Sequence, residues 1–165
     1  NFNIHGLWPS YAAGGSGPEN CSSTPFSEPS DLEAQMKQHW RSYAETDIEF
    51  WTHEWTKHGT CFSDNATPAT FFKQVLDLYA ANDPYNTMES AGMAPDSDKK
   101  ITLSDFEAAF SHKIAYTCET INGEDYLSTI EQCFTPSVEA MDCPSSKTYC
   151  GSYFYWPTMS QNQTN

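Results

Sequence analysis

The chain has few positive charges, and this shortage bears on the partners that it can bind. Lysine and arginine together number 8, against 22 aspartate and glutamate residues, for a formal net charge of −14 at pH 7. Proteins that hold nucleic acid usually present a basic face to the phosphates, so composition alone argues against such a partner. Two interpretations stay open: a highly soluble secreted protein, or one that meets an anionic substrate in acid, where carboxylates are neutralised and histidines protonated.

The sequence also lacks an apolar run of the roughly 20 residues that a membrane-spanning helix needs. It has no internal repeat and no domain linker, so residues 1–165 are expected to form a single domain, as a monomer and without a membrane partner. No signal peptide is visible and the chain begins at Asn1 rather than at methionine. This start indicates a processed or N-terminally truncated chain.

Cysteine is present in an even number, six, but never in the C-x-x-C spacing of a structural zinc site. An even count favours disulfides. N-glycosylation sequons at Asn20, Asn65 and Asn162 add weight, because glycosylation and disulfide formation take place on the same secretory route. The sequence therefore predicts a disulfide-bonded glycoprotein that is secreted or resides in a vacuole or lysosome.

Helix signals dominate the first two thirds of the chain. Residues 1–9 are expected to form a strand and residues 11–29 a loop rich in glycine, serine and proline. Four N-terminal capping signals then predict helices, beginning at Ser30, Thr46, Thr67 and Ser104. Apolar spacing predicts two buried stripes, one of Leu32, Met36, Trp40 and Tyr43 and one of Ile48, Trp51 and Trp55.

Strand signals dominate the last third. Residues 114–121 and 125–134 flank Asn122-Gly123, a hairpin turn signal, and a last strand is expected over 153–156. Residues 94–100 are polar and are expected to form a loop. Because helices and strands segregate, the predicted fold class is α+β, with an antiparallel sheet packed against several helices and stapled by disulfides.

The helix that is predicted to begin at Thr46 carries most of the candidate catalytic residues. Its segment Trp51-Thr52-His53-Glu54-Trp55-Thr56-Lys57-His58-Gly59-Thr60-Cys61 offers two imidazoles, one carboxylate and one ammonium, mostly on the side away from the apolar stripe, and Gly59 is a natural helix terminator. Polar helix faces are usually only solvated. Two histidines and two tryptophans in so short a segment weaken that interpretation.

Zinc is the first alternative for this segment, since His-Glu-x-x-His is the zinc protease motif. Here the spacing is His53 to His58, i to i+5, which turns the two rings about 140° apart on a regular helix. Lys57 also disfavours a cation. Metal-free cleavage of RNA fits better, because it needs an acid, a base and groups that neutralise a developing phosphate charge. His5, in the segment Ile4-His5-Gly6-Leu7-Trp8-Pro9, is a further imidazole; its alternative is a structural role at a shaped turn.

These residues resemble the ribonuclease T2 family. Ile4–Pro9 and His53–Cys61 match its two active-site segments without a gap, and the downstream pattern is also similar, at Ser90–Met93, Ile114–Cys118, Cys133, Asp142–Pro144 and Cys150. The resemblance implies an α+β fold and a secreted or vacuolar acid endoribonuclease of low base preference, with RNA as substrate and no cofactor or metal. Such an enzyme acts as a lyase and then a hydrolase, through a 2′,3′-cyclic phosphate.

The resemblance also implies a role for each matching residue. His58 is expected to be the base of the first step and His5 the acid, while His53 contacts phosphate. Glu54 and Lys57 are expected to stabilise the pentacovalent intermediate, and Trp8 to line the base pocket. The implied disulfides are Cys21–Cys61, Cys118–Cys150 and Cys133–Cys143.

Two departures from the family pattern stand out. Family members have a segment ahead of the first motif, whereas this chain begins inside the next strand, and Ser10 stands where aspartate or asparagine is common. A catalytically inactive family member, with a storage, defence or host-interaction role, is therefore the alternative to the enzyme. Intact residues at all five catalytic positions favour the enzyme.

Overall fold

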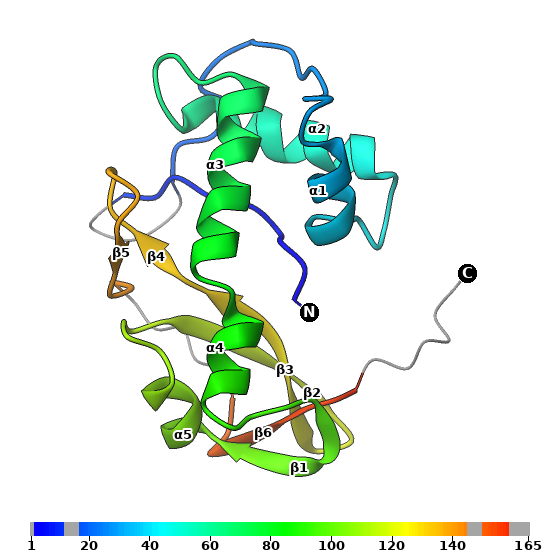
Figure 1. Cartoon of the computed structure of the whole chain (residues 1–165), viewed down its shortest axis with the longest axis vertical. Coiled ribbons are helices and arrows are strands. Elements are labelled where there is room, and N and C mark those ends of the chain that lie inside the picture. The colour runs from blue at the N-terminus through cyan, green and yellow to red at the C-terminus, as the bar shows by residue number, and fades with distance from the viewer. Residues whose placement is uncertain (1, 12–16, 145–149, 159–165) are drawn as a thin grey trace. The chain divides into compact units, whose positions relative to one another are not determined.

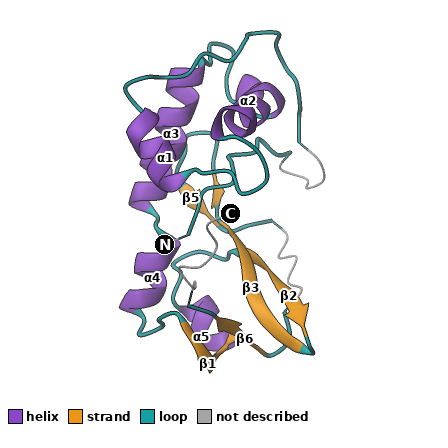
Figure 2. Cartoon of the chain, turned by 90° about the vertical axis from the view of Figure 1, so that its right-hand side faces the viewer, coloured by secondary structure: helices purple, strands orange, loops and turns teal. Residues whose placement is uncertain are grey.

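A computed structural model describes residues 2–11, 17–144 and 150–158 (Figure 1). It contains two compact units, Asn1–Asp83 and Pro84–Asn165. Helices and β-sheets are both present, which confirms the predicted α+β class (Figure 2). The single domain expected from the sequence stays a prediction.

The first unit is helical. It contains α1 (Glu33–His39), α2 (Asp47–Lys57), a short 3-10 helix (Gly59–Cys61) and α3 (Pro68–Ala81). The strand predicted over residues 1–9 is wrong for the described part of that range, 2–9. That segment is extended, but Ile4 donates its backbone N–H to the carbonyl of His39, at the end of a helix, and no strand lies opposite to form a ladder.

Aromatic side chains fill the core of this unit. Trp40, Trp51, Trp55, Phe71 and Phe72 are completely buried, and α1 packs against α3. Gly59 ends α2 as expected, but its φ is not positive. Glycine is needed there for space, since a Cβ would lie 2.5 Å from Trp55 Cε3 and 2.9 Å from Phe71 Cδ1.

Two of the predicted capping signals fail, and each apolar stripe loses one member. The predicted box at Ser30 does not form, because a turn in which Leu32 donates to the Pro29 carbonyl precedes α1 and leaves Leu32 as N-cap. Tyr43 and Ile48, expected in the stripes, are 80% and 43% exposed. Tyr43 lies beyond the end of α1, and Ile48 occupies the first turn of α2, where little packs on it.

The second unit consists of α4 (Pro84–Ser90), β1 (Asp96–Thr102), α5 (Leu103–Ala108), β2 (Ala115–Ile121), β3 (Glu124–Glu131), β4 (Cys133–Phe134), β5 (Ala140–Met141) and β6 (Tyr153–Trp156). Its main sheet has the order β1-β6-β3-β2, and β4 pairs with β5 separately. The predicted β2–β3 hairpin is confirmed. The main sheet was expected to be antiparallel and is mixed: β1 pairs with β6 and β2 with β3 in antiparallel fashion, whereas β3 and β6 pair in parallel through Tyr126 and Tyr155.

The loop predicted over residues 94–100 is also wrong, since β1 occupies most of it and pairs with β6. Its polar composition suits an edge strand, and only Ile101 is buried. The helix that follows is capped by Thr102 rather than by Ser104. Phe106 of α5 contacts Tyr116 and Phe154 edge to face, and these rings form the core under the sheet.

Candidate active site

An N-terminal cap and two tryptophans fix the position of helix α2, and with it the position of the candidate catalytic residues that the helix carries. Thr46 and Glu49 form the predicted reciprocal capping box, which satisfies two otherwise free N–H groups. Trp51 donates its indole N–H to the Trp40 carbonyl at 2.7 Å, and Trp55 donates to the Thr24 carbonyl at 2.9 Å. These contacts fix the rotation of α2 about its axis, and they therefore also fix the direction of the polar residues beside its buried face.

Glu54 is the least expected of the site residues, because it is buried rather than on the polar face. Its side chain is 2% exposed. Trp8 donates its indole N–H to Glu54 Oε2 at 3.0 Å, and His5 Nε2 lies 3.9 Å from Glu54 Oε1. Burial raises the pKa of Glu54, and the Trp8 hydrogen bond opposes that rise in part.

The segment 4–8 reaches Glu54 because two hydrogen bonds hold its backbone. Ile4 is buried in the core and bonds to the His39 carbonyl, and Trp40 donates its indole N–H to the His5 carbonyl at 2.7 Å. The Trp8–Glu54 hydrogen bond joins residues 46 positions apart. The structure thus brings together the two segments that the sequence marked separately.

Gly6 lets the two segments approach so closely. A Cβ at this position would lie 2.1 Å from Glu54 Oε2 and 2.6 Å from Trp8 Nε1, the two atoms of the hydrogen bond. Glu54 is buried and Trp8 packs against two imidazole rings, so no side chain fits there without moving them. Glycine at position 6 is thus a requirement of the site geometry.

The two candidate acid–base imidazoles lie against the same indole. The ring of Trp8 is 4.9 Å from that of His5 and 5.5 Å from that of His58, measured between centroids. His5 also contacts Phe50, a residue that the sequence did not single out, although it stands one helical turn before Glu54. Burial lowers the pKa of His58, Lys57 lowers it further, and Glu19 raises it.

Lys57 and His53 have different surroundings from these rings. Lys57 Nζ lies 3.5 Å from Glu19 Oε1, a partner that nothing in the sequence pattern indicated. His53 is exposed, and it stands on α2 next to Glu54 in the sequence. All five predicted catalytic residues and Trp8 therefore lie in one region of the first unit. Their roles stay predictions.

All three disulfides implied by the resemblance are present: Cys21–Cys61, Cys118–Cys150 and Cys133–Cys143. The first joins the loop before α1 to the 3-10 helix after α2. Of the predicted glycosylation positions, Asn20 and Asn65 are exposed, and Asn162 lies outside the described residues.

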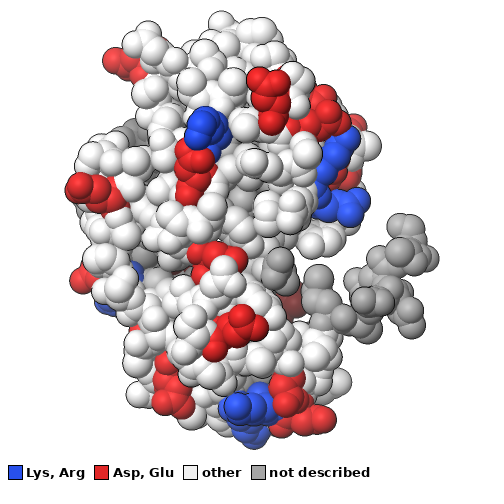
Figure 3. Space-filling view, in the orientation of Figure 1, with Lys and Arg blue, Asp and Glu red and all other residues white. Residues whose placement is uncertain are grey.

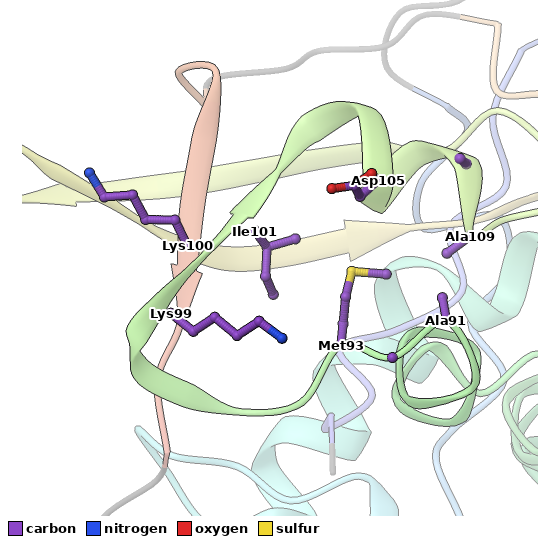
Figure 4. Close-up of a pocket in the computed structure, with 9 residues that line it drawn as sticks. Ala91, Met93, Lys99, Lys100, Ile101, Asp105 and Ala109 are labelled. Atoms are coloured by element: carbon purple, nitrogen blue, oxygen red, sulfur yellow. The ribbon is translucent and has the colours of Figure 1, made fainter.

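A separate pocket of about 320 Å³ lies in the second unit, between the end of α4, β1 and α5. Figure 4 shows Met93 and Ile101 facing it, with the Lys99 side chain along its rim. Its carboxylate, Asp105, already accepts a hydrogen bond from Thr102. This pocket has no histidine and offers no acid–base pair, so it is the weaker candidate for a catalytic site.

Two further features concern metals and membranes. Across the described residues, no group of three or more histidine, cysteine, aspartate or glutamate side chains is arranged to hold a metal ion. Over the same part of the chain, every helix is too short or too polar to cross a membrane.

Comparison with known proteins gives concordant matches. Residues 1–143 match the model of the ribonuclease T2 family. The chain is 32% identical to an intracellular ribonuclease LX of Solanum lycopersicum, over 98% of the chain and 73% of that protein. It is 37% identical to ribonuclease M of Aspergillus phoenicis, over 67% of the chain. That match spans 56% of the Aspergillus protein, little more than half of its length.

A solved structure agrees with these matches. RNase NT, crystallised in complex with 5′-AMP, superposes with a TM-score of 0.83 at 28% sequence identity. The superposition covers 94% of this chain and 82% of that one.

Proposed function

The chain belongs to the ribonuclease T2 family, and we propose on that basis that it is an endoribonuclease that cleaves single-stranded RNA. The observation that carries the proposal is the meeting of the two motif segments at Glu54. Trp8 and His5 come from one segment and Glu54 and His58 from the other, and side-chain contacts link all four residues. An acid, a base and a carboxylate are thereby available at one place.

His58 is the proposed base of the first step. It takes the proton of the 2′-hydroxyl, whose oxygen then attacks the adjacent phosphorus. A base must be neutral before the reaction, and burial and Lys57 both favour neutral His58 by lowering its pKa. This environment supports His58 rather than its more exposed neighbour His53 in that role.

His5 is the proposed acid. It protonates the departing 5′-oxygen as the P–O5′ bond breaks, which leaves a 2′,3′-cyclic phosphate on one product and a 5′-hydroxyl on the other. Glu54 Oε1 lies 3.9 Å from His5 Nε2, so its carboxyl group can help to orient this ring. Water later opens the cyclic phosphate, with the two histidines in exchanged roles.

The charge that builds up on phosphorus needs cations or donors beside it. Lys57 and a protonated His53 are the proposed cations, and Glu54 holds its neighbours in place and hydrogen-bonds to the intermediate when protonated. The raised pKa of Glu54 supports this donor role, because burial favours the neutral carboxyl.

Trp8 is the proposed base-binding residue. Trp8 is 40% exposed and its indole N–H is bonded to Glu54, which leaves part of the residue's surface for stacking. Stacking on a ring tolerates every base, which is consistent with low base preference.

The reaction needs one neutral and one charged imidazole, so we propose an optimum at mildly acidic pH and no metal.

The cysteines and sequons support a location on the secretory or vacuolar route, where disulfides persist. The rival proposal, an inactive family member, has less support. Every residue of the proposed mechanism is present, and those of both motif segments lie together.

A cleavage assay tests the proposal. The chain is incubated with a fluorescent oligoribonucleotide at about pH 5 in EDTA, and the products are identified by mass spectrometry. Cleavage to 2′,3′-cyclic phosphates is expected, together with a loss of at least about a hundredfold in His58→Phe, the usual scale for an acid–base group.

His112→Phe serves as the matched control, since His112 lies in the second unit and is not part of the proposed mechanism. It should keep full activity. Absence of cleavage in the wild-type chain, or cleavage that stops with EDTA, contradicts the proposed mechanism.

A further inference from the structure

A short segment, residues 19–21, lies against the end of α2 and is held there by three contacts. Asn20 donates its backbone N–H to the Lys57 carbonyl at 3.0 Å, and Cys21 donates to Thr60 Oγ1 at 3.1 Å. The Cys21–Cys61 disulfide closes the same junction. Glu19, the first residue of this segment, is therefore held next to the lysine that the mechanism assigns to phosphate.

Glu19 uses this position to pair with Lys57, with Oε1 and Nζ 3.5 Å apart. The two side chains are 44% and 37% exposed. Exposed ion pairs of this kind are weak, because water screens the attraction and two long side chains lose freedom. A phosphate group that arrives at Lys57 can therefore displace the carboxylate.

The competition between carboxylate and phosphate depends on charge. An RNA phosphodiester carries one negative charge, as Glu19 does, so the two compete for Lys57 on similar terms. The pentacovalent intermediate carries more negative charge than the diester and attracts Lys57 more strongly. Interactions that strengthen only as the reaction proceeds raise kcat, whereas those made equally with the substrate lower KM alone.

We propose that Glu19 is a positioning residue that holds Lys57 in the free protein and yields it to the phosphate as negative charge develops. The inference rests on the proposed function. Glu19 weakens binding of the uncleaved substrate and leaves the stabilisation of the intermediate nearly intact. It also adds a negative charge near His58, which otherwise faces Lys57, His53 and His5.

The variant Glu19→Gln tests this, with steady-state kinetics on a short oligoribonucleotide. KM is expected to fall about two- to fivefold, the range set by an exposed ion pair, and kcat to fall by a similar factor, because the intermediate is stabilised to nearly the same extent in both proteins. The rise of kcat/KM with pH should shift to lower pH, because Glu19 no longer raises the pKa of His58.

Two controls separate this role from a structural one. Glu28→Gln removes the same charge from the same loop and should leave KM and the pH profile unchanged. In a Lys57→Ala background, Glu19→Gln should no longer lower KM. An unchanged or higher KM in Glu19→Gln, or the same fall without Lys57, overturns the proposal, and so does an equal fall in Glu28→Gln.

Binding of inorganic phosphate separates failure of this inference from failure of the proposed function. Phosphate is titrated into the wild-type chain and Glu19→Gln, and the histidine ring resonances are followed by NMR. Tighter phosphate binding in Glu19→Gln supports the role of Glu19 even if the wild-type chain cleaves no RNA. Equal affinity in the two proteins overturns it, whether or not RNA is cleaved.

Discussion

At the scale of single residues, burial of Glu54 lowers the stability of the folded protein at neutral pH, although the side chain is needed for the proposed reaction. A carboxylate that is 2% exposed is costly to ionise, and one indole N–H together with a distant imidazole is modest compensation. The folded state consequently binds a proton at Glu54 more tightly than the unfolded chain does, so the raised pKa costs stability at neutral pH.

Replacing Glu54 by glutamine should stabilise the protein at neutral pH and abolish cleavage. Glutamine keeps an oxygen that can accept from Trp8 but carries no charge. The gain should be small at a pH below the unfolded value of 4.5, grow as the pH rises towards the folded pKa, and then stay constant. We expect roughly 0.5–2 kcal/mol at pH 7, measured by urea unfolding at several pH values.

Glu49→Gln is the control, because the change in stability at neutral pH should have the opposite sign from that of Glu54→Gln. Hydrogen bonds from Thr46 lower the pKa of Glu49, so its contribution is present above the unfolded value and is lost as the pH falls through the folded pKa. This variant should lose stability at neutral pH. A Glu54→Gln protein that is less stable than wild type at pH 7 would show that the buried charge is well compensated.

Gly6→Ala should disrupt the site directly. The new Cβ would lie 2.1 Å from Glu54 Oε2, so either the backbone of residue 6 or the Trp8–Glu54 pair must move. Overpacking of this kind costs about 1–3 kcal/mol, and we expect a fall of at least about tenfold in kcat/KM. Thermal unfolding and oligoribonucleotide cleavage measure the two effects.

Trp8→Phe is the companion variant, since it removes the indole N–H without adding volume beside Glu54. If Gly6→Ala acts through that hydrogen bond, combining the two changes should cost less than the sum of the single effects. Additive effects would place the cause of the Gly6→Ala defect elsewhere.

Residue identities were predictable from the sequence, but their environments were not. The motif pattern indicated His5, Glu54 and His58, and the structure brings them together. Burial of Glu54 depends on Trp8, which is 46 positions away, and helical periodicity contains no information about such a contact. The Glu19–Lys57 pair escaped prediction for the same reason, since a disulfide-linked loop creates it.

At the scale of elements, local signals succeeded where the neighbouring residues alone determine the structure. The Thr46 box begins α2 and Thr67-Pro68 begins α3, because each cap involves residues within one turn. Residues 94–100 failed because a partner strand, β6, turns a polar segment into β1. The parallel contact between β3 and β6 likewise has no local signature.

The Cys21–Cys61 disulfide should matter for both stability and activity. It closes a span of 40 residues, which is worth about 4 kcal/mol in the chain-entropy model. The double variant Cys21→Ser/Cys61→Ser should unfold at a lower urea concentration. It should also lose activity, because the end of α2, which carries Lys57 and is followed by His58, would be held less firmly.

Cys133→Ser/Cys143→Ser is the matched comparison. That disulfide spans 10 residues in the second unit and should contribute roughly 2.7 kcal/mol in the same model. Its loss should lower stability with little change in kcat/KM at a temperature where the variant stays folded. Equal losses of activity in the two variants would argue that the first disulfide only stabilises.

At the scale of the whole molecule, the negative charge is widespread. Figure 3 shows acidic side chains scattered over the visible face, with few basic ones among them. With a formal net charge of −14, the chain repels a polyanion at neutral pH, and only local cations such as Lys57 oppose this. The fold class followed from composition and pattern, whereas the charge alone argued against the proposed substrate.

Salt should therefore accelerate the reaction at neutral pH. Raising the ionic strength screens the repulsion between the chain and RNA, and kcat/KM for a short oligoribonucleotide should rise, by roughly two- to tenfold between low salt and about 0.2 M. Near pH 5 the rise should be smaller, since part of the carboxylate charge is neutralised. Initial rates at two pH values and several NaCl concentrations measure this, and a rate that falls with salt at both would contradict it.

The way in which residues 2–8 are held has a consequence for folding dynamics. Ile4, the indole of Trp40 and the hydroxyl of Tyr79, which donates to the Phe2 carbonyl, fasten this segment to helices, and no strand ladder adds to them. Segments secured by few hydrogen bonds open locally before a protein unfolds globally. On gradual denaturation the chain should therefore lose the protection of its Ile4 amide, and with it its catalysis, while the helical core around Trp51 still resists hydrogen exchange.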